Sequence, residues 1–340
     1  MKVCILGPMY SEKHYGGIAT FDEGLKKGLE KEGHEVLVIT DTCKKESVKQ
    51  FKKIDIIVFN KKILREIKNF KPDLVISSMY YGLLNRKIKK DLSKTIIIQF
   101  IHGFPTFRYG MFKKYILNKM LKYIRRHSDH FVSNSKFTSC INNEIYGIKV
   151  DKYIHLGLDE PFVDFEKVKN EVIKCVFAGR LVEEKNVDKV CEIFGYMSNL
   201  VENLQLTIIG DGPEMEKLKN TFVSDNINFI GRRTRTETLN IIKNSDIFIS
   251  LNPHEPFGLV FLEALLYKCK IICPNTGGQT EFLANFREVM MVDMNNYKMK
   301  DQIYKEFLSY DGFSEINLKK FFDFYNYRRV ARELIEFIKE

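Results

Sequence analysis

The segment that most constrains the fold of this 340-residue chain is Asp246–Leu251, the apolar run DIFISL, together with the residues that follow it. The run is short, rich in β-forming residues and bounded by turn residues, which predicts a buried parallel strand. Glu255 precedes a proline, which biases it away from helical geometry, so it should lie in the following loop. Gly258 allows the backbone to approach a ligand closely, and Leu259–Leu266 then predict an apolar helix.

The start of that helix is a candidate binding site. Unpaired N–H groups and the positive end of the helix dipole suit an anion there. The residues at this start are Phe257, Gly258, Leu259 and Val260. Glu263 lies further along the same helix, so Glu255 and Glu263 could hold two hydroxyl-bearing parts of an extended ligand, such as a sugar and a ribose. Two solvated glutamates on an ordinary helix are the alternative, and the spacing alone does not decide between them.

The eleven residues Glu255–Leu265, EPFGLVFLEAL, resemble the Glu-x7-Glu signature of retaining glycosyltransferases of the GT-B fold, specifically family 4, the glycogen-synthase-like group. The resemblance extends over most of the chain. It implies an α/β protein in which two Rossmann-like, doubly wound parallel-sheet domains face a central cleft. It also implies that the C-terminal helix crosses back to the first domain.

The domain boundary is predicted near residue 165. Asp159–Asn170 is acidic, contains one proline and has no clear period, so it is interpreted as a linker. With the resemblance, the chain divides into an acceptor-binding domain (1–165), a nucleotide-sugar-binding domain (166–320) and a final helix (321–340) that packs back on the first domain.

The charge of +10 is concentrated in the first half of the chain. Residues 1–165 contain 30 Lys and Arg against 18 Asp and Glu, whereas the remainder contains 24 against 26. Such an excess points to a partner of that half, and nucleic acid, anionic membrane, anionic substrate or a merely solvated surface all fit it. Seven scattered cysteines, no bilayer-length apolar run and no signal sequence favour a cytoplasmic protein with reduced thiols.

The first half of the chain contributes two candidate binding elements, the Gly16–Gly17 loop and His102, which follow predicted strands. Strands are predicted at Lys2–Pro8, Glu35–Thr40, Asp55–Phe59, Asp73–Ser77, Thr95–His102 and Asp129–Ser133. Gly16 and Gly17 precede a helix predicted from about Ile18 to Glu32, although a plain turn is an equal alternative. His102 ends a strand, where a lone histidine is more often structural. The resemblance implies instead that the Gly16–Gly17 loop lies against the donor phosphates and that His102 contacts the donor sugar.

Gly110–His127 predicts a basic amphipathic helix. Its apolar residues recur at helical spacing and its remaining positions carry six lysines and arginines without an acidic residue. Such a helix could lie on an anionic membrane, or it could pack on the core with a solvated basic face. Lys61-Lys62 and Lys87–Lys90 could belong to the same surface.

A cationic pair is predicted in the second half. Arg180 directly follows the strand Glu171–Ala178, and Lys185 follows five residues later. A guanidinium fork and an ammonium at one strand end suit a diphosphate, although either could be an ordinary surface cation. The resemblance implies that this G-R-x4-K pattern is the diphosphate clamp, with Asn186 in place of the usual glycine. Further donor-binding candidates, in turns after later strands, are Gly210, Gly212, Arg232, Gly277 and Gly278.

The resemblance implies a hexosyl- or N-acetylhexosaminyl-transferase that retains anomeric configuration. It would move a sugar from a UDP- or GDP-sugar to a glycan or lipid-linked acceptor in cell-surface polysaccharide or glycoconjugate synthesis. The enzyme could contact the inner face of the cell membrane peripherally. His102, Arg180, Lys185 and Glu255 are the catalytic candidates. No metal is expected, since the sequence lacks a D-x-D pair and a His/Asp cluster with ligand spacing. No cofactor and no nucleic-acid partner are expected either. A sugar-nucleotide epimerase or hydrolase, or a non-catalytic basic binding module, are the alternatives.

Overall fold

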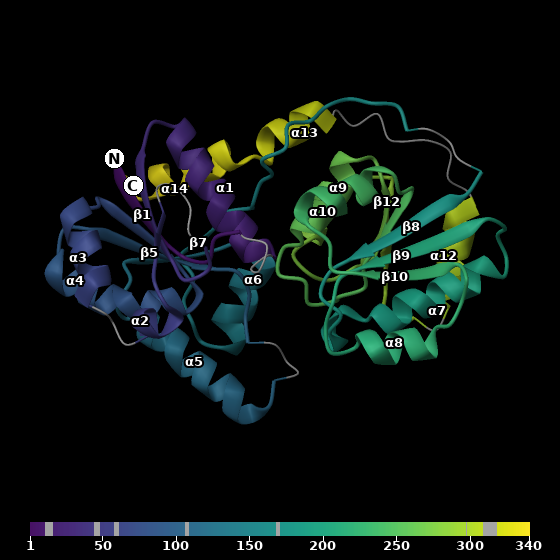
Figure 1. Cartoon of the computed structure of the whole chain (residues 1–340), viewed down its shortest axis with the longest axis horizontal. Coiled ribbons are helices and arrows are strands. Elements are labelled where there is room, and N and C mark those ends of the chain that lie inside the picture. The colour runs from purple at the N-terminus through teal and green to yellow at the C-terminus, as the bar shows by residue number, and fades with distance from the viewer. Residues whose placement is uncertain are drawn as a thin grey trace. The chain divides into compact units, whose positions relative to one another are not determined.

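The computed structural model of the chain contains two compact units. It describes residues 1–10, 16–43, 48–57, 61–105, 109–167, 171–296, 298–308 and 318–340. The first unit comprises Met1–Pro161 and Phe322–Glu340, and the second comprises Phe162–Phe321 (Figure 1). The chain therefore leaves the first unit once and returns to it near its end.

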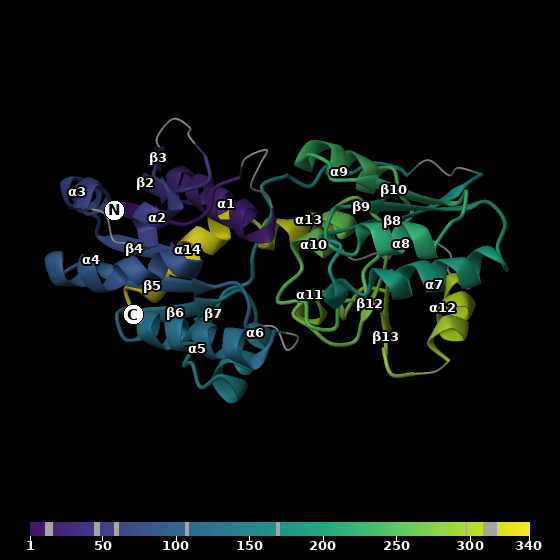
Figure 2. The same ribbon diagram turned by 60° about the horizontal axis from the view of Figure 1, so that its bottom comes forward.

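The first unit is built on a parallel sheet. Over its described residues the sheet has seven strands in the order β3-β2-β1-β4-β5-β6-β7. They are β1 (Lys2–Leu6), β2 (Glu35–Thr40), β3 (Val48–Gln50), β4 (Leu74–Ser78), β5 (Ile96–Ile101), β6 (His130–Ser133) and β7 (Lys152–Tyr153). Consecutive residues of β1, from Val3 to Leu6, are all fully buried. Both faces of the sheet are therefore covered, as is usual for parallel sheets (Figure 2).

The helices of the first unit follow from amphipathic segments between these strands. They are α1 (Gly17–Lys31), α2 (Lys53–Ile57), α3 (Lys61–Phe70), the 3₁₀ helix η1 (Met79–Leu84), α4 (Asn85–Asp91), α5 (Met111–Arg125), α6 (Lys136–Cys140), the π-helix η2 (Ile141–Ile145) and α14 (Tyr327–Phe337). The C-terminal helix α14 lies against α1: side chains at Gly24 and Gly28 would collide with Tyr327. The two helices can approach this closely only because α1 has glycine at both positions.

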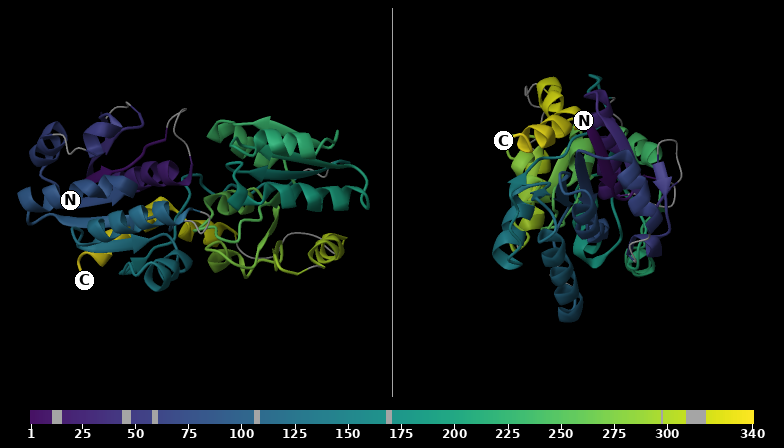
Figure 3. Two further views of the ribbon diagram at one scale, coloured as in Figure 1. Left: turned by 90° about the horizontal axis from the view of Figure 1, so that it is seen from below. Right: turned by 90° about the vertical axis from the view of Figure 1, so that its left-hand side faces the viewer.

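The second unit repeats the same architecture. Over its described residues the parallel sheet has six strands in the order β10-β9-β8-β11-β12-β13. They are β8 (Ile173–Ala178), β9 (Leu204–Ile209), β10 (Ile227–Gly231), β11 (Ile247–Ile249), β12 (Lys270–Pro274) and β13 (Val289–Val292). The helices are η3 (Glu183–Lys185), α7 (Val187–Ser198), α8 (Met215–Thr221), α9 (Arg235–Lys243), α10 (Leu259–Leu266), α11 (Thr280–Leu283) and α12 (Met299–Leu308), and they flank the sheet (Figure 3).

Strand order locates the expected binding edges. In each sheet the order reverses once, between β1 and β4 in the first unit and between β8 and β11 in the second. Ligands of open α/β sheets bind outside the carboxyl ends of the strands at such switch points. Arg180 follows β8 and Glu255 follows β11, so both candidates lie after strands that flank the switch point.

The predicted fold class is confirmed, with local corrections. Two parallel-sheet units are present, and the C-terminal segment belongs to the first. The strand predicted at Asp55–Phe59 is wrong: Lys53–Ile57 forms helix α2, while residues 58–60 lie outside the described residues. Asn326 divides the predicted final helix into α13 (Leu318–Phe324) and α14, because its side chain accepts a hydrogen bond from the N–H of Arg329 and caps α14.

Candidate active site

Lys185 and Glu255 meet at the switch point of the second sheet. Lys185 ends η3 after β8, and its Nζ lies 2.5 Å from Oε2 of Glu255. Asn252 Nδ2 donates to the same carboxylate oxygen at 3.1 Å. Two of the residues predicted to be catalytic are thus brought together from segments 70 positions apart in the sequence. Both side chains keep partial exposure, so a ligand can reach them.

Arg180 lies at the same edge of the sheet, in the loop that follows β8. Its residue is exposed, and it makes no hydrogen bond or ion pair through its side chain with the described residues. A guanidinium with its donors available is suited to bidentate contact with an anion such as a phosphate.

The glycines that follow β9 support the loop that carries Arg180. Gly210 has φ 142°, and a Cβ there would lie 1.8 Å from the carbonyl oxygen of Gly179. A Cβ on Gly212 would lie 2.2 Å from the carbonyl oxygen of Leu181. The predicted Gly210 and Gly212 therefore let the β9 loop pack directly on the β8 loop. Arg232 is exposed in the turn after β10, at the edge of the sheet.

The backbone conformation of Asn186 shows why asparagine can replace the glycine that is usual at this position in the family pattern. Its backbone adopts φ 48° and ψ 45°, the left-handed conformation that glycine adopts readily and asparagine tolerates best among other residues. Its Nδ2 donates to the carbonyl oxygen of Leu251 at 2.7 Å, which ties the start of α7 to the end of β11. The loop shape is preserved and gains a hydrogen bond that glycine cannot form.

We expect Asn186→Gly to change the free energy of unfolding by no more than about 1 kcal/mol, because relief of the left-handed backbone offsets the lost hydrogen bond. Asn186→Ala loses the bond and keeps the strain, so it should destabilise by about 2–3 kcal/mol. Urea unfolding of the two variants measures this difference. Equal stability of the glycine and alanine variants would contradict the assigned role of the backbone conformation.

The start of α10 is shaped by close backbone packing. Gly258 has φ 88° at the N-cap position, and the N–H of Gly278 donates to the carbonyl oxygen of Glu255 at 2.8 Å. A Cβ on Gly278 would lie 2.0 Å from the carbonyl oxygen of Pro256, and Gly277 has φ 109°. The predicted Gly277–Gly278 turn thus packs against the loop that carries Glu255.

The side chains at this helix start belong to the core. Phe257 is 1% exposed and packs on Phe282, with ring centroids 5.0 Å apart, and Leu259 is also buried. Phe257 and Leu259 can therefore contact a ligand only through their backbone, whereas Val260 is partly exposed.

Glu263 has a partner that the sequence did not reveal. Its side chain is buried in α10, and its Oε1 lies 2.5 Å from Arg235 at the first residue of α9. Thr234 caps α9 in a capping box with Glu237, which fixes where Arg235 begins the helix. The T-x-x-E pattern is present in the sequence and could have located this helix start, but nothing in it indicates the contact with Glu263.

His102 is held by Ser78 in the first unit. It follows β5, and its Nε2 lies 3.0 Å from Oγ of Ser78, the last residue of β4. Burial lowers the pKa of His102 to about 3, so the imidazole is neutral near pH 7. Gly16 caps α1 with φ 127° and Gly17 is its first residue, while residues 11–15 of the predicted loop lie outside the described residues.

Family models divide the chain as its two units do. The family described as "Glycosyl transferases group 1" matches residues 160–310, and "Glycosyltransferase Family 4" matches residues 15–159. The chain belongs to the GT-B glycosyltransferases. This glycosyltransferase has, among its described helices, none that is long and apolar enough to cross a bilayer.

Individual relatives share 23–27% of their residues with this chain over the aligned segments. The alpha-monoglucosyldiacylglycerol synthase of Streptococcus pneumoniae is 27% identical over 296 residues, which cover 73% of this chain and 66% of that protein. The synthase of the same name from Acholeplasma laidlawii is 23% identical, covering 75% of this chain and 76% of that protein. A GDP-mannose-dependent alpha-mannosyltransferase of Mycolicibacterium smegmatis is 27% identical over 36% of this chain and 31% of its own length.

Solved structures share the fold. Sucrose-phosphate synthase from Thermosynechococcus elongatus aligns with a TM-score of 0.78 at 13% identity, covering 99% of this chain and 98% of that one. Anabaena HepE, solved in complex with UDP, aligns with a TM-score of 0.74 at 12% identity over the whole of both chains. At such identities these likenesses establish the fold alone.

Proposed function

We propose that this glycosyltransferase is a retaining, metal-independent enzyme that transfers a sugar from a UDP- or GDP-sugar to a lipid-linked acceptor at a membrane surface. The observation that carries the proposal is the ion pair between Lys185 and Glu255 at the switch point of the second sheet, in the loops that follow β8 and β11. Arg180 belongs to the same loop after β8 as Lys185. A guanidinium with no side-chain partner among the described residues, on the same loop as the lysine of an ammonium–carboxylate pair, would offer positive charge to a diphosphate, and the carboxylate would offer hydrogen-bond acceptors to sugar hydroxyls.

Charge complementarity supports this assignment of roles. Breaking the bond between sugar and diphosphate places negative charge on the departing nucleoside diphosphate and positive charge on the anomeric carbon. Arg180, Lys185 and the N-terminus of α10 would stabilise the departing group. Glu255 would accept hydrogen bonds from the sugar, and Glu263, kept in place by Arg235, would bind the ribose. His102 is proposed to contact the donor sugar.

A lipid-linked acceptor is supported by the surface of α5. Its N-terminal half exposes large apolar side chains, with Met111 89% and Phe112 77% exposed. Tyr115, Ile116 and Lys119 continue the same exposed face at helical spacing. The C-terminal half instead packs on the core, where Ile124 is fully buried. The core-packing interpretation of the sequence therefore applies to the C-terminal half, and we propose that the exposed N-terminal half is the part that contacts a membrane.

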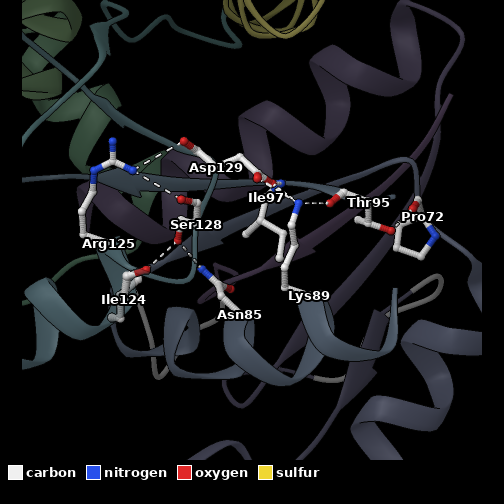
Figure 4. Close-up of polar contacts among 9 residues, drawn as sticks. All are labelled: Pro72, Asn85, Lys89, Thr95, Ile97, Ile124, Arg125, Ser128 and Asp129. Atoms are coloured by element: carbon white, nitrogen blue, oxygen red, sulfur yellow. Dashed lines mark hydrogen bonds and ion pairs between the residues drawn. The ribbon is translucent and has the colours of Figure 1, made fainter. Parts of the chain in front are cut away.

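The basic residues around α5 have two different uses. Lys89 contacts both carboxylate oxygens of Asp129 at 2.7 and 2.8 Å, and Arg125 donates to the carbonyl oxygens of Ser128 and Asp129 (Figure 4). These two cations tie α4 and α5 to the sheet. Lys113 and Lys119 are exposed, with their ammonium groups over the rings of Tyr109 and Tyr115. We therefore assign the membrane-facing charge to Lys113 and Lys119. The similarity to the two alpha-monoglucosyldiacylglycerol synthases also supports a lipid acceptor.

An acceptor-dependence assay tests the reaction class. With radiolabelled UDP- and GDP-sugars and vesicles that contain diacylglycerol or its glucosylated form, nucleoside diphosphate should be released only when acceptor and matching donor are both present. The rate should be unchanged by EDTA, and NMR of the glycolipid should show the anomeric configuration of the donor.

Release without acceptor would identify a hydrolase, and interconversion of the donor sugar would identify an epimerase. Either result would contradict the proposal, as would loss of activity in EDTA that Mg²⁺ or Mn²⁺ restores. Boiled enzyme and the Arg180→Ala variant serve as controls for spontaneous donor breakdown.

A further inference from the structure

A buried chain of polar side chains leads to His102. Ser78 Oγ lies 3.0 Å from His102 Nε2 and 2.9 Å from Oδ1 of Asp22, which belongs to α1. Asp22 and Ser78 are both completely buried. The three side chains come from α1, the end of β4 and the end of β5, beside the switch point of the first sheet.

Asp22 lies where an ionised carboxylate would be poorly stabilised. Among the described residues it has no cationic partner, and its Oδ2 has no hydrogen-bond donor. A Cβ on Gly7 would lie 2.1 Å from Oδ2, so the carboxyl group packs directly against the end of β1. Burying a lone carboxylate with one hydrogen bond costs far more than burying the neutral acid. Burial accordingly raises the pKa of Asp22 well above its usual range, and the Ser78 hydrogen bond opposes this only in part.

His102 is a neutral imidazole with apolar neighbours. The rings of Phe21 and Phe100 lie 4.8 and 5.0 Å from its ring centroid. A neutral imidazole carries one proton, on Nδ1 or on Nε2, and the partner of the other nitrogen decides which. Because Nε2 faces Ser78, the direction of the hydrogen bonds along the chain fixes the tautomer.

Two arrangements let the Ser78 hydroxyl donate to one of its neighbours and accept from the other. An ionised Asp22 would accept from Ser78, and Ser78 would accept from Nε2–H. A protonated Asp22 can instead donate from Oδ1 to Ser78, and Ser78 then donates to Nε2. In this second arrangement Oδ2 is a bare carbonyl oxygen, which tolerates burial without a partner better than an unpaired donor does.

We propose that Asp22 is a protonated carboxylic acid that, through Ser78, holds His102 in the neutral tautomer with its proton on Nδ1. His102 then presents an N–H donor and cannot act as a general base. The following consequence rests on the proposed function. The Nδ1–H group of His102 would donate a hydrogen bond to an oxygen of the sugar in the nucleotide-sugar, and His102 would take no proton from the acceptor substrate. Asp22 and Ser78 are positioning residues in this scheme.

Long-range ¹H–¹⁵N correlation spectra of protein labelled with ¹⁵N-histidine report the tautomer directly, with His102→Gln used to assign the signal. We expect Nδ1 to carry the proton in the wild type and in Asp22→Asn, whose amide is a neutral donor of the same shape. Ser78→Ala breaks the chain and should change the tautomer population. Ser77→Ala is the matched control, because Ser77 is buried on the same strand but bonds to Gln99.

In kinetic assays we expect Asp22→Asn to retain about tenfold more kcat/KM than Asp22→Ala, since only the amide restores the donor. A wild-type spectrum with the proton on Nε2, or an Asp22→Asn spectrum that switches tautomer, would overturn the proposal. Absence of transferase activity with every donor and acceptor would count against the proposed function and would leave the tautomer result unaffected.

Discussion

Replacing Arg180 with alanine is expected to lower kcat by about 10²–10³-fold without unfolding the protein. The guanidinium has no partner among the described residues, so its removal leaves no buried group unsatisfied. Its proposed contact is with the charge that develops on the leaving diphosphate. Arg180→Lys should recover only part of the loss, because an ammonium cannot make the bidentate contact.

Lys185→Ala should reduce activity to a similar extent but through two effects. It removes a cation from the diphosphate and also releases Glu255 from its ion pair. The KM for the donor should therefore rise together with the fall in kcat. Steady-state kinetics measures both parameters, and thermal unfolding monitors the fold.

Lys217→Ala is the matched control for these two variants. Lys217 is an exposed lysine of the second unit, and it pairs with Glu214 at 3.3 Å on α8. Its loss should leave kcat and KM unchanged. Near-normal turnover of both Arg180→Ala and Lys185→Ala, or an equal loss in Lys217→Ala, would remove the basis for the diphosphate assignment.

Binding to anionic vesicles is expected to weaken about 30-fold in a Lys113→Gln/Lys119→Gln variant at low salt. Each lysine near an anionic surface contributes about 1 kcal/mol, and 1.4 kcal/mol corresponds to a factor of ten. Co-sedimentation with vesicles containing phosphatidylglycerol, over a series of salt concentrations, measures the effect. The difference from wild type should shrink as salt screens the charges.

The apolar part of the α5 face is tested separately. Phe112→Ser with Ile116→Ser should weaken binding at high salt as well, because lost burial of apolar surface is not screened. Lys217→Gln/Lys219→Gln removes the same charge from an exposed helix of the second unit and is the control for net charge. If it weakens binding as much as the α5 variant does, α5 is not the membrane-contacting surface.

The sequence predicted the architecture well because the parallel strands are short apolar runs that end in turns. Glu35–Thr40 and Leu259–Leu266 form a strand and a helix with the predicted bounds. The error at Asp55–Phe59 has a local cause. Its two isoleucines resemble a buried strand, yet Ile57 is exposed on α2 and only Ile56 is buried. A short apolar run does not by itself distinguish a strand from a helix.

Contacts within the candidate site could be predicted only where the positions of motifs relative to strand ends determined them. The meeting of Lys185 and Glu255 follows from their places after β8 and β11, which flank the switch point. The contact of Arg235 with Glu263 depends on how α9 packs on α10, which no local pattern encodes. Asp22 did leave a trace in the sequence, because it falls on the buried face of α1 with Leu25 and Leu29. A carboxylate in an apolar stripe is a signal of a polar partner.

The packing of α14 on α1 has a consequence for biosynthesis. Tyr327 fits against Gly24 and Gly28, and Arg329 donates to the carbonyl oxygens of His155 and Leu156. These contacts join the part of the first unit that is translated before the second unit to a segment translated after it. Domains tend to fold in the order in which they leave the ribosome. Here the second unit can complete its sheet before α14, the last helix of the first unit, has been synthesised. The first unit is therefore translated first but completes its folding last.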